Sequence, residues 1–101
     1  MNVQDQNQLE HEIVDRLQSV IDPETGADVI RMRLVEDLTV NDKGWVSYTF
    51  RPSSPLCPIA VYLIQQIKQA VAEVSGVTNQ TITVSDYAAA EELTKLINQE
   101  I

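Results

Sequence analysis

Apolar residues recur at helical spacing between residues 60 and 74, and this stripe limits the folds that are open to the chain. It covers about four turns of helix, and Gly76 follows it where a left-handed cap would end the helix. Alternating segments at residues 45–51 and 81–85 flank it and predict strands. A connection of this length allows a right-handed crossover, so the last strand is expected to run parallel to one of the two strands that precede the helix. The stripe consists of Ala60, Leu63, Ile64, Ile67, Ala70, Val71 and Val74.

The first half of the chain supplies a helix and a hairpin. Residues 9–21 have helical periodicity and end before Pro23, whereas residues 1–8 are polar and are expected to be frayed. Residues 35–40 predict a strand that turns back through Asn41-Asp42-Lys43-Gly44. The apolar positions of this first helix are Leu9, Ile13, Val14, Leu17, Val20 and Ile21.

The chain closes with a third helix within residues 86–101, which are rich in Ala and Glu. Its expected apolar face, formed by Ala89, Leu93, Leu96 and Ile97, either covers the sheet or contacts a partner. We therefore expect a single domain over residues 1–101. Its fold class is a two-layer α/β (α+β) fold with a mixed three-stranded sheet, helices on one face and the order α-β-β-α-β-α.

Composition argues against several classes of protein. The formal net charge of −8 works against binding to nucleic acid and to anionic membrane surfaces. No apolar run approaches the roughly 20 residues of a membrane helix, and no signal peptide is evident. The single cysteine cannot form an intramolecular disulfide, which fits a cytoplasmic protein.

That cysteine lies in the stretch Arg51-Pro52-Ser53-Ser54-Pro55-Leu56-Cys57-Pro58, between the second strand and the long helix. Pro58 suits the first helical position, so Cys57 is predicted to be the N-cap or a close neighbour of it. A thiol at a helix N-terminus has a lowered pKa, because the helix dipole and free N–H groups favour thiolate. The alternative is a small buried apolar residue.

Asp22-Pro23-Glu24-Thr25-Gly26 has the chemistry of a turn, with Gly26 at a position of positive φ. Its carboxylates either cap this turn or provide oxygen donors at a fixed spacing. His11 lies off the apolar stripe of its helix and is expected to be a surface residue.

The order of these segments resembles the SufT/PaaD-like family of metal–sulfur cluster biosynthesis proteins. Its members typically read Asp-Pro-Glu, Leu-Gly-Leu-Val, Thr-Ser-Pro-x-Cys-Pro and Gly-Val. The corresponding segments of this chain follow in the same order: Asp22-Pro23-Glu24, Met32-Arg33-Leu34-Val35, Ser53-Ser54-Pro55-Leu56-Cys57-Pro58 and Gly76-Val77. Arg33 replaces the usual glycine, so the backbone or surface there is expected to differ. The usual Pro-Pro-Trp ending is absent, which affects any partner contact made by that tail.

The resemblance implies a maturation factor that assembles iron–sulfur clusters or delivers them to apo-proteins, with Cys57 as the metal ligand or transfer point. It implies that Asp22 and Glu24 shape, charge or ligate the neighbouring site, and that Thr49, Ser53 and Ser54 donate hydroxyl hydrogen bonds. Because clusters normally take four thiolates, we expect a transient iron–sulfur cluster or iron. Further ligands would come from a homodimer, from carboxylates or His11, or from a partner.

Two other functions stay open at this point. The first is an accessory interaction subunit of a larger complex, as in PaaD-like proteins, with Cys57 structural. The second is a cysteine-dependent enzyme, for which His11 is the only histidine and stands on a distant helix. The expected partners are other cluster-assembly proteins and apo iron–sulfur proteins.

Overall fold

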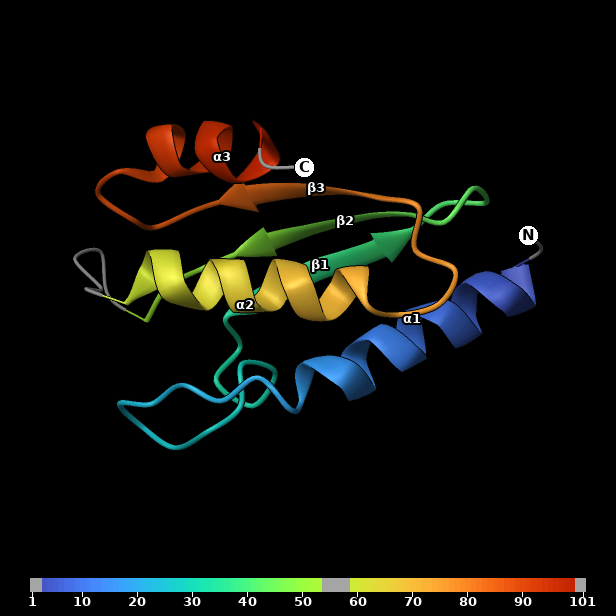
Figure 1. The fold of residues 1–101 in the computed structure, drawn as a ribbon, viewed down its shortest axis with the longest axis horizontal. Coiled ribbons are helices and arrows are strands. Elements are labelled where there is room, and N and C mark those ends of the chain that lie inside the picture. Colours follow the sequence, from blue (N-terminus) through green and yellow to red (C-terminus); the bar gives the residue numbers. More distant parts are fainter. Residues whose placement is uncertain (1–2, 54–58, 100–101) are drawn as a thin grey trace.

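The computed structural model describes residues 3–53 and 59–99, which form three helices and a three-stranded sheet (Figure 1). The order α-β-β-α-β-α is as predicted. The elements are α1 (Val3–Leu17), β1 (Val35–Val40), β2 (Trp45–Phe50), α2 (Ala60–Ala72), β3 (Asn79–Val84) and α3 (Ala90–Gln99). None of the helices in these two ranges is long and apolar enough to cross a bilayer.

β2 is the central strand of the sheet. It pairs antiparallel with β1 through the predicted hairpin, in which Gly44 has a φ of 81°. It pairs parallel with β3, from Trp45 opposite Asn79 to Phe50 opposite Val84. The predicted parallel pair is therefore confirmed, and α2 forms the connection between its strands.

One face of the sheet is buried under the helices, and Figure 1 shows α2 lying across the strands with α1 alongside it. Val46, Tyr48 and Phe50 of β2 point into this core and are buried. The predicted stripe of α2 is buried from Ala60 to Val71, and Val74 is partly buried. The opposite side, which we call the open face, carries Trp45, Ser47 and Thr49 of β2 and Thr81 and Thr83 of β3.

α1 differs from the prediction at both ends. It begins at Val3, earlier than the start predicted near Leu9. The polar residues before Leu9 are compatible with helix, and Asp5 in the first turn complements the dipole. After Leu17 the chain leaves the helix, so Ile21 is 46% exposed while Leu9, Ile13 and Leu17 are buried.

α3 lies along the outer edge of β3, so it packs on the sheet, which is the first of the two alternatives left open for it. The Asn98 carboxamide pairs with both the N–H and the C=O of Ile82, and Thr94 Oγ1 accepts from the N–H of Val84. Leu93 and Ile97 are buried, but Leu96 is 50% exposed and Ala89 precedes the helix. The prediction was therefore wrong for Ala89 and Leu96. The helix docks on the edge of β3 through a narrow apolar stripe that contains Leu93 and Ile97.

Candidate functional site

The parallel strands β2 and β3 end at the same edge of the sheet, after Phe50 and Val84, and we call this the carboxyl edge. Residues 51–59 leave this edge toward α2, and residues 85–89 leave it toward α3. Open α/β sheets bind ligands outside the carboxyl ends of parallel strands, because connecting segments converge there. The connection after β2 contains the predicted site residues Ser53, Ser54 and Cys57. Ser53 is exposed, and Ser54 and Cys57 lie outside the described residues.

The long helix after this connection begins at Ala60, with Ile59 as its N-cap. Cys57 and Pro58 lie outside the described residues. The predicted place of Cys57, at the N-cap or close to it, therefore stays a prediction. Ala60, the first residue of the helix, is fully buried in the core.

The positive end of α2 lacks the usual compensation. Ile59 provides no side-chain cap, and the first turn contains no acidic residue. The first N–H groups of a helix have no partner within it, and the dipole adds to their positive potential. Within the described residues, this helix end is thus suited to an anionic neighbour such as a thiolate.

Asp22 forms a capped turn, which is one of the two alternatives that its sequence left open. Its side chain is only 2% exposed, and Oδ1 accepts a 2.7 Å hydrogen bond from the N–H of Glu24. Backbone bonds from Gly26 N–H to Asp22 C=O and from Asp22 N–H to Ala27 C=O close the turn, with Gly26 at a φ of 74°. Glu24, in contrast, is exposed.

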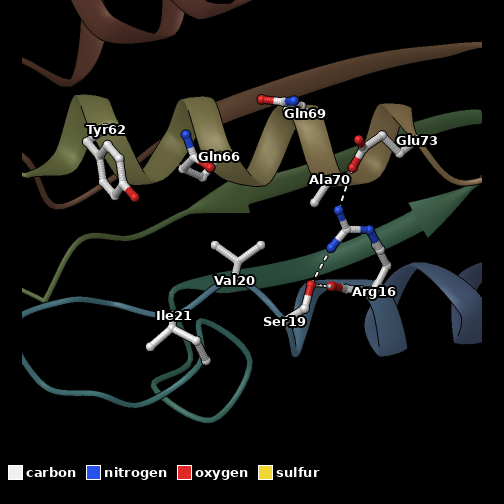
Figure 2. A pocket seen from close by; sticks show the side chains of 9 residues that line it. All are labelled: Arg16, Ser19, Val20, Ile21, Tyr62, Gln66, Gln69, Ala70 and Glu73. Carbon is white, nitrogen blue, oxygen red and sulfur yellow. Dashed lines mark hydrogen bonds and ion pairs between the residues drawn. The ribbon is translucent and has the colours of Figure 1, made fainter.

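A groove connects the residue before this turn with α2. Ile21, the residue before Asp22, and Tyr62 of α2 line the same groove, with a volume of about 360 Å³ (Figure 2). Both side chains are large and about half exposed. Ile21 and Tyr62 thus face one groove, although they are far apart in the sequence.

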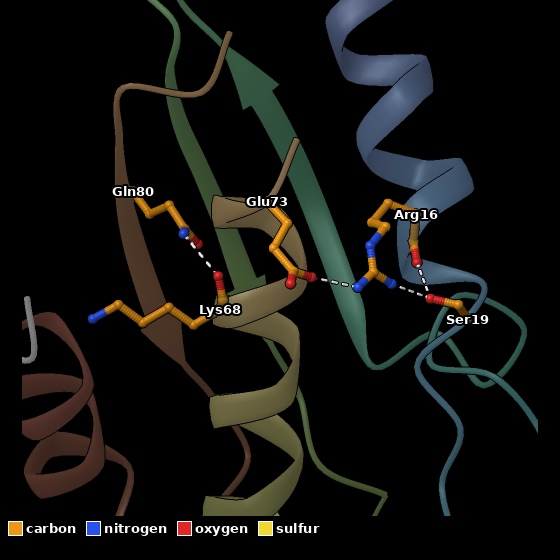
Figure 3. Close-up of polar contacts among 5 residues, drawn as sticks. All are labelled: Arg16, Ser19, Lys68, Glu73 and Gln80. Carbon is orange, nitrogen blue, oxygen red and sulfur yellow. Dashed lines mark hydrogen bonds and ion pairs between the residues drawn. The ribbon is translucent and has the colours of Figure 1, made fainter. Parts of the chain in front are cut away.

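The far end of the groove is closed by polar contacts between α1 and α2. Arg16 pairs with Glu73 and donates to the Ser19 hydroxyl, which in turn donates to the Arg16 carbonyl (Figures 2 and 3). On the other side of α2, Gln80 of β3 donates to the Lys68 carbonyl (Figure 3). These contacts fix α2 against both its neighbours.

Thr49 lies on the open face near the end of β2, opposite Glu36 of β1 and Thr83 of β3. Arg51 follows on the same face by strand alternation, and its side chain reaches across all three strands. Its guanidinium lies 3.3 Å from Glu36 and 3.1 Å from Asp86, which comes just after β3. Sequence reasoning did not identify Arg51, Glu36 and Asp86 as a cluster, because their contact depends on the register of two strand pairs.

His11 is a surface residue, as expected. Its side chain is 80% exposed on α1, and its neighbour is Asp15, four residues on, at 3.9 Å. Over residues 3–53 and 59–99, no three His, Cys, Asp or Glu side chains are grouped closely enough to hold a metal ion.

Comparisons with known proteins agree on one family. The family model described as "Iron-sulfur cluster assembly protein" matches residues 10–84. The Fe–S protein maturation auxiliary factor YitW of Bacillus subtilis is 29% identical over 76 residues, which cover 75% of this chain and 74% of that protein. The Fe–S protein maturation auxiliary factor SufT of Staphylococcus aureus is 31% identical over 65 residues, covering 64% and 74%.

A solved structure shares the fold. The crystal structure of a domain of unknown function from Bacillus anthracis has a TM-score of 0.76 and 25% sequence identity to this chain. The match covers 95% of this chain and 93% of that one. All six elements described above therefore fall within a known α+β architecture.

Proposed function

This chain belongs to the iron–sulfur cluster assembly protein family and has a role in iron–sulfur protein maturation, and we propose that it is a transient carrier or adaptor that delivers clusters to apo-proteins through Cys57. The cluster, or iron alone, is the cargo of this reaction and not a resident cofactor. The observation that carries the proposal is the position of the Cys57 connection. It follows the carboxyl end of β2 and precedes a helix whose positive end, among the described residues, has no acidic residue in its first turn and no side-chain cap from Ile59.

The chemistry of one thiol supports transfer over storage. Thiolate is a soft ligand that suits iron bound to sulfide, and a position near a helix N-terminus favours thiolate. Clusters normally take four thiolates, and this chain has a single cysteine. The remaining ligands would come from a second copy of the chain, from a cluster-assembly protein or from the apo-protein that receives the cluster.

The other proposed site residues would act around the thiolate. Asp22 holds its turn in shape and leaves the exposed Glu24 to contribute charge or an oxygen ligand. Ser53, Ser54 and Thr49 would provide hydroxyl hydrogen bonds to sulfur or to the connection. A single unpaired cysteine and this chemistry fit a reducing cytoplasm.

An adaptor without cargo is the second candidate, and one observation favours it. Ile21 and Tyr62 expose about half of their large side chains on the two sides of one groove, and exposed apolar residues of this kind mark interaction surfaces. In that case the chain would recruit other proteins of the pathway, and Cys57 would be structural.

Anaerobic reconstitution with iron and sulfide distinguishes the two candidates. Wild type and Cys57→Ser would be compared by visible absorbance, by iron and sulfide content and by mass under native conditions. We expect uptake by the wild type only, and the mass would show whether two chains share the cargo. Ser75→Ala, an exposed change elsewhere, serves as the control. Equal uptake by wild type and Cys57→Ser would contradict transfer through Cys57. Uptake by neither would exclude a carrier role for the isolated chain and favour the adaptor.

A further inference from the structure

The exposed side of α2 differs from the exposed sides of the other two helices because it carries no charged residue. α2 is described in full, and its one charged residue, Lys68, is partly buried and donates to the Ile97 carbonyl. Both other helices expose charged residues, namely Asp5, Glu12 and Asp15 on α1 and Glu91, Glu92 and Lys95 on α3. We call the exposed residues of α2 the α2 strip, and they are Val61, Tyr62, Gln65, Gln66, Gln69 and Ala72.

The α2 strip follows one side of the helix and has an apolar end. Its members recur at intervals of three or four residues, which places them in line on a helix, and Figure 2 shows Tyr62, Gln66 and Gln69 in succession along α2. Tyr62 and Val61 are 50% and 42% exposed. The outer face of a surface helix normally carries charged residues, whereas the centre of a protein interface is depleted of them and enriched in tyrosine. The α2 strip therefore has the composition of an interface.

The polar groups of the α2 strip are complementary to a second copy of themselves. A glutamine carboxamide contains both a donor and an acceptor, and a tyrosine hydroxyl can act as either. In a two-fold symmetric contact the same patch meets itself, so amides can pair with their own copies while charges of one sign repel theirs. The chain has a formal net charge of −8, which disfavours contact between copies through acidic surfaces. The α2 strip avoids this repulsion.

The position of Gln66 determines what would meet in such a contact. α2 extends from Ala60 to Ala72, so Gln66 is its middle residue. Two packed helices have axes about 8–10 Å apart, and a residue close to the two-fold axis faces its own copy. The groove of about 360 Å³ beside Tyr62, Gln66 and Gln69 leaves room for side chains of the second helix (Figure 2).

We propose that the α2 strip is a self-association surface, through which two copies of this chain form a reversible dimer about a two-fold axis near Gln66. Glutamine side chains lose rotamer freedom when they are ordered in a contact, so the dimer is weak and its population depends on protein concentration. This inference goes beyond the proposed function and involves no cargo.

Sedimentation equilibrium of the chain without iron, over a series of concentrations and with a reductant present, measures the dissociation constant. Gln66→Glu and Gln66→Lys each place like charges opposite one another, and we expect each to raise the dissociation constant by about tenfold or more. An equimolar mixture of the two variants places opposite charges there and should associate more tightly than either variant alone. Gln99→Glu, the same substitution at an exposed position of α3, should keep the wild-type constant.

The variants are expected to remain folded, because exposed substitutions of this kind change the free energy of unfolding by no more than about 0.5 kcal/mol. Denaturation midpoints measured by circular dichroism check this for each variant.

Two results would overturn the inference. The mass of a single chain at every concentration would show that copies do not associate, and would leave the α2 strip to a different protein. A dimer that Gln66→Glu and Gln66→Lys weaken no more than Gln99→Glu, or variants whose mixture associates no better than each alone, would place the contact elsewhere. The measurement needs no iron, so a failure of the wild type to take up cluster overturns the proposed function and leaves this test intact.

Discussion

Arg33 adopts a left-handed backbone conformation that costs an ordinary residue energy. Its φ is 59°, and its N–H donates to the Ile30 carbonyl within the turn that leads into β1. The family resemblance places glycine at this position, and the substitution predicted a changed backbone or surface. The conformation here is one that glycine adopts without a steric penalty, so arginine bears strain in the turn.

Replacing Arg33 with glycine should stabilise the protein. The left-handed conformation costs an L-residue about 1–2 kcal/mol, and part of the gain is lost because glycine is more flexible when unfolded. We expect Arg33→Gly to raise the free energy of unfolding by about 0.5–1 kcal/mol in urea denaturation. Arg31→Gly, in the same exposed turn but without positive φ, should bring no gain. An equal gain in both would contradict this explanation.

Tyr48 has a buried hydroxyl that donates to Gln80 Oε1 at 2.8 Å. Burial raises the pKa of Tyr48 well above its ordinary value. The folded protein therefore keeps this proton at pH values where the unfolded chain, with a tyrosine pKa of about 10, releases it. The contribution of Tyr48 to the free energy of unfolding is therefore fully present below a pH of about 10 and decreases as the pH rises further.

Tyr48→Phe should remove this pH dependence. Above pH of about 10 the wild type should lose up to about 1.4 kcal/mol of stability per pH unit through Tyr48. The free energy of unfolding of the variant should decrease less steeply with pH than that of the wild type. Denaturation series between pH 9 and 11, around the ordinary tyrosine pKa of about 10, would measure this. Tyr62→Phe changes an exposed tyrosine and should keep the wild-type slope. A wild-type slope in Tyr48→Phe would disprove the assignment.

The two edges of the sheet are protected by different elements. β1 carries an irregular register between Glu36 and Thr39, with Asp37 at a φ of 55°. Bulges and charges on an edge strand discourage pairing with another chain. β3 instead has its outer edge covered by α3, whose side chains satisfy the backbone groups of Ile82 and Val84.

Asn98→Ala should loosen α3 from the sheet. It removes an acceptor for the Ile82 N–H and a donor for the Ile82 carbonyl, which should cost about 1–3 kcal/mol in free energy of unfolding. Hydrogen exchange at the Ile82 amide should accelerate more than exchange at Tyr48 in the central strand. Gln99→Ala, an exposed change on the same helix, should leave both rates unchanged. Unchanged exchange at Ile82 in Asn98→Ala would argue against this contact.

Over the whole molecule, residues from all three helices and from β2 and β3 share one buried core. Ile13 of α1, Ile67 of α2 and Ile97 of α3 are each at most 1% exposed and belong to the same cluster. The sole tryptophan, Trp45, lies outside this cluster on the open face. It can therefore report on the sheet while circular dichroism reports on the helices.

Ile13→Ala should destabilise the entire protein and not α1 alone. A cavity at a fully buried isoleucine costs about 2–5 kcal/mol. Trp45 fluorescence and far-ultraviolet circular dichroism should then show coincident transitions at a lower denaturant midpoint. His11→Ala, at an exposed position of the same helix, should stay within about 0.5 kcal/mol of the wild type. Separate transitions for the two probes would contradict a single core.

The order of elements and the positions of the turns could be predicted because periodicity and turn chemistry act between near neighbours in the chain. The stripe from Ala60 to Val71, the alternation from Val46 to Phe50 and the glycines of both turns are signals of this kind. The ends of helices were predicted less well. They depend on packing, as the exposure of Ile21 and Leu96 shows.

The chemistry of single residues and the family pattern led to the predictions for Cys57 and the Asp22 turn, of which the structure describes the turn. The sequence did not predict the ion pairs of Arg51 with Glu36 and Asp86. Nor did it predict that Ile21 and Tyr62 line one groove. Each of these contacts joins segments that are distant in the chain. They form only when three features of the fold are present together: the parallel pairing of β2 with β3, the irregular antiparallel register of β1 with β2, and the packing of α2 on the sheet. No local sequence pattern encodes that combination.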